Sequence, residues 1–117
     1  MENYKLSLDL SPPIPYISLM SNIIKTVDGY GTITYKLNGL LHREDGPATE
    51  YSSGTKIWFL NGELHREDGP AMEWADGDKY WYRNDKCHRE DGPAIEYASG
   101  SKFWYKNGKQ IKASDSL

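Results

Sequence analysis

Apolar and polar residues alternate in short runs along the chain, and this pattern predicts β-strands. The run at residues 55–60 (TKIWFL) is rich in β-branched and aromatic residues, and the Asn61-Gly62 pair after it is a strong hairpin signal. A second type of run at residues 71–74 (AMEW) ends at the Asp76-Gly77 turn. No window has helical periodicity supported by capping residues. The pattern therefore predicts an all-β chain made of short hairpins.

These runs recur with a period of 23 residues, because the sequence HREDGPA occurs at 42–48, 65–71 and 88–94. The period aligns the chain without gaps and places glycines, aromatic residues and asparagines in fixed columns. The columns are Gly31, Gly54, Gly77 and Gly100; Tyr35, Trp58, Trp81 and Trp104; and Asn38, Asn61, Asn84 and Asn107. Such a period marks a repeat array, in which each unit contacts its neighbours and no unit folds well alone.

We therefore expect an antiparallel β-hairpin repeat array, a curved meander sheet of about eight strands from residue 25 onward in about four units. The expected repeat domain covers residues 26–117, with repeats near 31–53, 54–76 and 77–99 and a degenerate last unit at 100–117. Residues 1–25 lie mostly outside the pattern and contain an apolar stretch that could cap the first repeat.

Composition narrows the class of protein. The chain has 117 residues, of which 38% are hydrophobic and 13% aromatic, and this favours a thin aromatic sheet over a layered domain. Its net charge of −3 disfavours long nucleic acid and anionic membrane as partners. The single cysteine, Cys87, occupies the column of Leu41 and Leu64, and the N-terminus lacks a secretory pattern. We expect a cytoplasmic protein, in the host cell if a virus encodes it.

The repeating unit G-x-K-x-W-Y-x-N-G-x-x-H-R-E-D-G-P-A-x-E-Y resembles MORN repeats, and more closely the MORN-variant repeats of bacterial, phage and large-DNA-virus proteins. The resemblance covers residues 30–110, approximately. It implies a non-enzymatic β-hairpin array used as a scaffold, and some variant members are antitoxin or immunity proteins. This chain carries Arg-Glu-Asp-Gly-Pro where a typical MORN unit has a short glycine-rich link, so the lipid binding of typical MORN proteins is not carried over.

The three histidines, His42, His65 and His88, share one column and are candidate binding residues. An aspartate three residues after each could orient its imidazole for metal binding or base catalysis. Two-stranded units, however, place successive histidines roughly 10 Å apart, too far for one ion to bridge. No nucleophile, base and orienting group occur together in a known catalytic motif. We therefore expect no metal, no cofactor and no enzymatic activity.

Two further columns supply candidate binding residues. Arg43, Arg66 and Arg89 stand beside Glu-Asp pairs, and we expect each arginine to pair with a carboxylate of the next unit in a ladder along one edge. The aromatic rings could stack between repeats or form an exposed platform for a ligand. The aromatic candidates are Trp58, Trp81, Trp104 and Tyr82.

Three functions fit these features. The first is a non-catalytic protein-binding module that acts as an inhibitor, an immunity protein or a viral anti-defence protein. The second is a protein that sequesters a small anionic ligand such as a nucleotide, in pockets between repeats or between the protomers of a homo-oligomer. The third is a structural scaffold. Arginine and aromatic residues dominate interface hot spots, so a repeated edge rich in both favours a protein partner.

Overall fold

The structure is a computed structural model that describes residues 22–112, and within this range it contains strands and turns but no helix. The expected all-β hairpin array is confirmed. The strands are β1 (Ile23–Val27), β2 (Ile33–Leu37), β3 (Leu40–Leu41), β4 (Thr49–Glu50), β5 (Lys56–Ile57), β6 (Phe59–Leu60), β7 (Glu63–Leu64), β8 (Met72–Glu73), β9 (Lys79–Tyr80), β10 (Tyr82–Arg83), β11 (Lys86–Cys87), β12 (Ile95–Glu96), β13 (Lys102–Lys106) and β14 (Lys109–Ile111).

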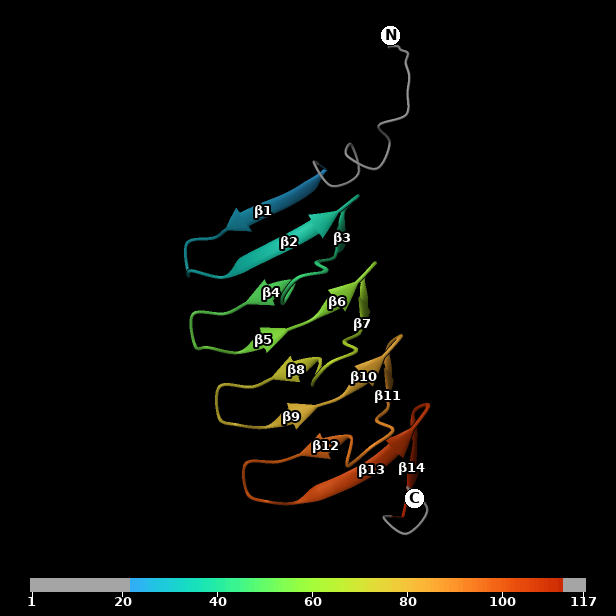
Figure 1. The fold of residues 1–117 in the computed structure, drawn as a ribbon. Helices are drawn as coiled ribbons and strands as arrows, with labels where there is room; N and C mark the ends of the chain where they lie inside the picture. Colours follow the sequence, from blue (N-terminus) through green and yellow to red (C-terminus); the bar gives the residue numbers. More distant parts are fainter. Residues whose placement is uncertain (1–21, 113–117) are drawn as a thin grey trace, which may run out of the picture.

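The repeats stack in chain order, so that the array grows in one direction from β1 to β14 (Figure 1). Ten strands form an open antiparallel main sheet in the order β1-β2-β4-β5-β8-β9-β12-β13-β14, with β3 paired to β2. The short hairpins β6-β7 and β10-β11 lie beside one another at one side of this sheet (Figure 1). Each unit therefore contacts the unit before and the unit after it, as expected for a repeat array.

The structure has more strands than expected, in part because the predicted strands of the second and third units divide at Trp58 and Trp81. The equivalent strands β2 and β13 run unbroken through Tyr35 and Trp104. In the run at residues 55–60, β5 pairs with β4 and β8, whereas β6 pairs with β7. Trp58 lies at this change of partner. Its backbone N–H donates to the Ala71 carbonyl at 2.7 Å, and its carbonyl accepts from the His65 N–H at 3.2 Å. The chain thus passes from the main sheet into the hairpin at Trp58.

The asparagine column forms the hairpin turns that the sequence indicated. Asn61 and Gly62 have φ angles of 50° and 81°, both in the left-handed region required at the two central positions of such a turn. The third unit has Asp85 in place of the glycine, with φ 66°. The Asp85 side chain also contacts the preceding hairpin, where its Oδ1 accepts a hydrogen bond from the backbone N–H of Leu64 at 2.7 Å.

The register gives the main sheet two unlike faces, since cross-strand partners point to the same side. We call one the neutral face, because none of the side chains in its central row is charged. That row is Thr34, Thr49, Ile57, Met72, Tyr80, Ile95 and Phe103. The adjacent row on the opposite side, the charged face, alternates acidic and basic residues after its first member: Ile33, Glu50, Lys56, Glu73, Lys79, Glu96 and Lys102.

The array is one layer thick, with principal extents of 58, 36 and 17 Å. Its core is correspondingly small. The buried apolar residues among residues 22–112 are Ala48, Ile57, Ala71, Cys87 and Ala94. A single layer cannot bury large side chains on both sides, so contacts between neighbouring repeats have to supply much of the stability.

The N-terminal segment that could cap the first repeat falls largely at residues 1–21, outside the described residues. Residues 23–25 of that segment belong to β1 and pair with β2. Between residues 22 and 112, no helix is long and apolar enough to cross a membrane.

Candidate functional site

The arginine of each HREDGPA block is held in a clamp formed by its own repeat. In the second unit, the Arg66 guanidinium carbon lies 3.9 Å from the centre of the Trp58 ring. Arg66 Nε donates to Asp68 at 3.0 Å, and Nη1 donates to the Pro70 carbonyl at 3.0 Å and to Glu73 at 2.8 Å. A cation over an aromatic face contributes about 0.5–2 kcal/mol, and charge-assisted hydrogen bonds fix its orientation.

Glycine closes the clamp on the side of the guanidinium away from the ring. A Cβ on residue 69 would lie 2.8 Å from Arg66 Cζ, closer than such atoms approach one another. Gly69 has no left-handed φ, so the requirement is for space rather than for backbone freedom. The next residue, Pro70, has no N–H to satisfy and offers its carbonyl to the arginine. The block therefore encodes a folded-back loop around one guanidinium group.

The first and third units repeat the same clamp. Arg43 lies 4.1 Å from the centre of the Tyr35 ring, and Arg89 lies 3.9 Å from the centre of the Trp81 ring. Their carboxylate partners occupy equivalent positions: Asp45 and Glu50 for Arg43, and Asp91 and Glu96 for Arg89.

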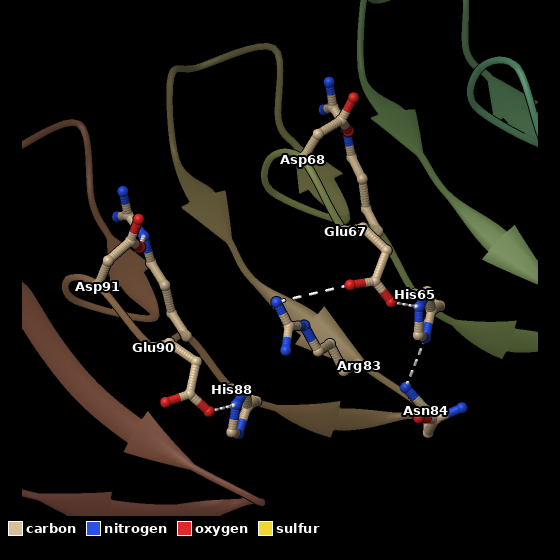
Figure 2. Close-up of polar contacts among 10 residues, drawn as sticks. His65, Glu67, Asp68, Arg83, Asn84, His88, Glu90 and Asp91 are labelled. Atoms are coloured by element: carbon tan, nitrogen blue, oxygen red, sulfur yellow. Dashed lines mark hydrogen bonds and ion pairs between the residues drawn. The ribbon is translucent and has the colours of Figure 1, made fainter.

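The expected pairing of each arginine with the next unit is wrong. Each arginine bonds carboxylates two and seven residues further along its own repeat, because the loop folds back on itself. Ion pairs between units use other residues. Arg83 reaches Glu67 of the preceding unit at 3.5 Å (Figure 2), and Lys106 reaches Glu90 at 3.6 Å.

Each histidine links its own loop to the next repeat. In the second unit, His65 Nδ1 accepts the backbone N–H of Asn84 at 3.1 Å, and Nε2 contacts Glu67 (Figure 2). In the first unit, the Asn61 N–H donates to His42 Nδ1 at 2.9 Å. In the third, the Asn107 N–H donates to His88 Nδ1 at 2.9 Å. The carboxylate partner therefore lies two residues after the histidine, not three as expected.

This arrangement fixes the chemistry of the imidazole. Because Nδ1 accepts a hydrogen bond, it carries no proton, and the proton on Nε2 is donated to the glutamate. His88 is 7% exposed, and both of its ring nitrogens are occupied. The hydrogen bond from His88, with the nearby charge of Lys106, lowers the pKa of the Glu90 carboxyl. Among residues 22–112, no three His, Cys, Asp or Glu side chains are grouped to hold a metal ion.

The tryptophan column does not stack between repeats. Trp58 and Trp81 carry arginines of their own units, and the ring–ring contacts found in the described range link other residues. Trp104 is half-buried and belongs to the last unit, which has no HREDGPA block to place an arginine on it. Tyr82, also half-buried, pairs with Cys87 across the β10-β11 hairpin. Burial raises the pKa of the Tyr82 hydroxyl and raises that of the Cys87 thiol to about 11.

Carboxylates, not arginines, form the outer surface of the three loops. We call the side of the array formed by residues 42–47, 65–70 and 88–93 the loop edge. The arginine side chains there are only 21–23% exposed. The aspartates are 86–87% exposed and the adjacent glutamates 58–80%. The exposed acidic residues are Glu44, Asp45, Glu67, Asp68, Glu90 and Asp91.

Two equivalent grooves lie between successive loops of this edge. The first groove, about 550 Å³, lies between the loop of the first unit and Trp58, Leu60 and the loop of the second. The second groove, about 440 Å³, has the same construction one repeat further on. Its lining differs in having Arg83 where the first groove has Leu60. Arg66, Glu67 and Asp68 line both grooves, so the central loop is shared.

The sequence placed the candidate residues along one edge, but it did not indicate which groups that edge exposes. The histidines and arginines of the first three units lie together with Tyr35, Trp58 and Trp81, in contacts that hold the loops. The missed residues are the glutamates and aspartates of the same blocks. The sequence did contain a signal for these residues, because each block has two carboxylates and one arginine. One negative charge therefore remains after the arginine has paired.

Comparison with protein-family models found no match to this chain. Comparisons with curated proteins and with solved structures likewise found none. The resemblance to MORN-variant repeats therefore stays a prediction drawn from the residues.

Proposed function

We propose that this chain is a non-catalytic binding protein that holds a protein partner along the loop edge. The pair of equivalent grooves carries the proposal. Two cavities of about 550 and 440 Å³ follow one another at the repeat period, and each has a tryptophan wall and an acidic rim. Consecutive recognition sites along one edge suit an extended or ridged protein surface better than a single compact ligand.

The charge of the grooves favours a partner that presents basic side chains. In the first groove, Arg43 and Arg66 are outnumbered by Glu44, Asp45, Glu67 and Asp68. In the second groove, three arginines face four carboxylates. The carboxylates are also the more exposed groups, so the field at the edge attracts lysine and arginine. The same balance disfavours a nucleotide or another small anion.

The arginines and histidines support the site rather than form its contact surface. Arg66 Nε and Nη1 and both ring nitrogens of His65 are engaged within the array. The partner would therefore meet mainly carboxylates, tryptophan edges and loop backbone. A rigid, repeated edge of this kind suits an inhibitor or immunity protein, including a viral anti-defence protein, because binding would order little of the chain. A pure scaffold would leave both grooves without a specific occupant.

Copurification from the native host followed by mass spectrometry would identify the partner, and calorimetry would give the stoichiometry. We expect one protein partner per chain, with an affinity that falls as ionic strength rises. A nucleotide or inorganic phosphate should not raise the melting temperature. Several equivalent small-anion sites per chain would support sequestration instead, and the absence of any specific partner would support a scaffold.

A further inference from the structure

The neutral face of the main sheet has no second layer among residues 22–112, yet it carries large apolar side chains. Tyr51 is 43% exposed, Trp74 is 42% exposed and Phe103 is 36% exposed. Tyr97 belongs to the same face, because its ring meets Tyr80 at 6.0 Å and Phe103 at 5.8 Å in edge-to-face contacts. Exposed apolar patches of this kind on a folded protein mark interaction sites.

A shallow groove shows how this face could receive a side chain. It encloses about 430 Å³ and is bordered by Tyr30, Tyr51 and Trp74, with Ile57 among its lining residues. Tyr30 is 86% exposed. The remaining lining residues are hydroxyl-bearing, and the groove contains no charged residue: Thr32, Ser52, Ser53 and Thr55. A groove of this kind suits an aromatic or aliphatic side chain and offers nothing to pair with a charge.

The occupant must be a surface that is itself neutral and apolar, because burying an unpaired charge against this face is unfavourable. Of the surfaces on this chain, the loop edge is acidic and the charged face alternates acidic and basic side chains. The central row of the neutral face, together with its groove, is uncharged and meets the requirement. We propose that the neutral face binds the neutral face of a second copy of the chain, about a two-fold axis.

The dimensions are adequate for such a dimer. The two long extents of the array are 58 and 36 Å, so one face can bury the roughly 800 Å² per partner of a standard interface. Two sheets pack face to face at about 10 Å, with the inner side chains interdigitating. A two-fold interface is self-complementary, so the exposed Trp74 of each copy can occupy the groove beside Tyr51 of the other. The loop edges stay free, so this inference is independent of the proposed function.

Sedimentation velocity of the full chain over a range of concentrations tests the proposal. We expect a species of twice 13.4 kDa that dissociates on dilution. Trp74→Thr and Tyr51→Thr should each raise the dissociation constant at least about tenfold, because exposed aromatic residues act as hot spots. Lys79→Thr is the matched control, because Lys79 precedes Tyr80 in β9 but points to the charged face. It should leave the dissociation constant unchanged.

Far-UV circular dichroism and the melting temperature of each variant verify folding, and Tyr51→Thr carries the test if Trp74→Thr is unstable. A monomer at every concentration would overturn the proposal. A dimer that withstands both aromatic substitutions would do the same. A monomer in which Trp74 resists hydroxyl-radical oxidation would indicate that residues 1–21 of the same chain cover the neutral face. That result would also overturn the proposal.

Discussion

Gly69 lies directly against the guanidinium group of Arg66, on the side opposite the Trp58 ring. A Cβ at position 69 would approach Arg66 Cζ to 2.8 Å, so any larger residue there would have to displace the guanidinium group. The same contact recurs at Gly46 with Arg43, and at Gly92 with Arg89. This contact explains why the block contains a glycine. It also shows that the arginine has a structural role, which the repeated sequence alone did not indicate.

Gly69→Ala should therefore destabilise the protein. The added methyl group would push the guanidinium out of the clamp, and overpacking of this kind costs about 1–3 kcal/mol. Gly29→Ala is the control, because a Cβ at position 29 meets nothing within 4 Å and Gly29 has no left-handed φ. Urea unfolding of the two variants measures the difference. Equal free energies of unfolding would show that the Arg66 clamp contributes little.

The histidine at the junction of two repeats should act through its Nδ1 acceptor. His88→Phe removes the acceptor for the Asn107 N–H, and loss of this part-buried hydrogen bond should cost about 0.5–1.5 kcal/mol. His88→Asn keeps an acceptor oxygen near the position of Nδ1, so it should cost less. Thermal unfolding of both variants tests this order. A phenylalanine variant as stable as the asparagine variant would show that His88 acts through packing alone.

The Cys87 thiol should be unreactive in the folded protein. Burial raises its pKa from 9.0 to about 11, so the folded chain keeps the thiol protonated where the unfolded chain ionises it. This contribution to stability is complete below the ordinary pKa and is lost as the pH rises toward about 11. Alkylation of the Cys87 thiol at about pH 8 should be slow without denaturant and fast in guanidinium chloride.

Cys87→Leu is the natural control for that measurement. Leucine occupies the same column at Leu41 and Leu64, so the variant should lose all thiol reactivity and stay within about 1.5 kcal/mol of the parent. Equal alkylation rates in the folded and denatured parent would contradict the buried position of Cys87.

Deletion of residues 65–87 removes one period and should leave a folded protein of lower stability. The deletion joins Leu64 to His88, which replaces His65 in register, so the remaining neighbours meet through equivalent contacts. A nearest-neighbour array loses one unit and one interface, not the whole fold. Circular dichroism and urea unfolding check this. Complete unfolding of the shortened chain would show that the four units fold only as one closed structure.

Much of the fold could be predicted because its signals are local. The Asn61-Gly62 turn and the β-branched and aromatic residues at 55–60 together indicate a hairpin within a few residues. The division of that run at Trp58 was not predictable, since the apolar residues 57–60 continue through it without a break. The division follows from a change of strand partner, and the new partner lies beyond the turn.

The candidate site shows a similar limit. The sequence placed the arginines, histidines and tryptophans along one edge, but the choice of partner depends on how the loop folds back. Arg66 finds Glu73 within its own unit, and His65 finds the backbone of Asn84, nineteen residues further on. Once these groups are engaged, Glu67 and Asp68 remain as the outer surface. That surface therefore follows from the three-dimensional pairing and not from the composition of the block.

We propose that the acidic loop edge holds a protein partner. The most direct test is the partner's affinity for the Glu67→Gln, Asp68→Asn double variant. Both substitutions remove charge but keep an acceptor oxygen for His65 and Arg66, so the loop should stay folded. Asp76→Asn is the control, because it removes a carboxylate whose contact with the Asp78 N–H lies away from both grooves. We predict that calorimetry with the copurified partner will show at least about tenfold weaker binding by the double variant and unchanged binding by the control. Equal affinities of the folded double variant and the parent would contradict the proposal.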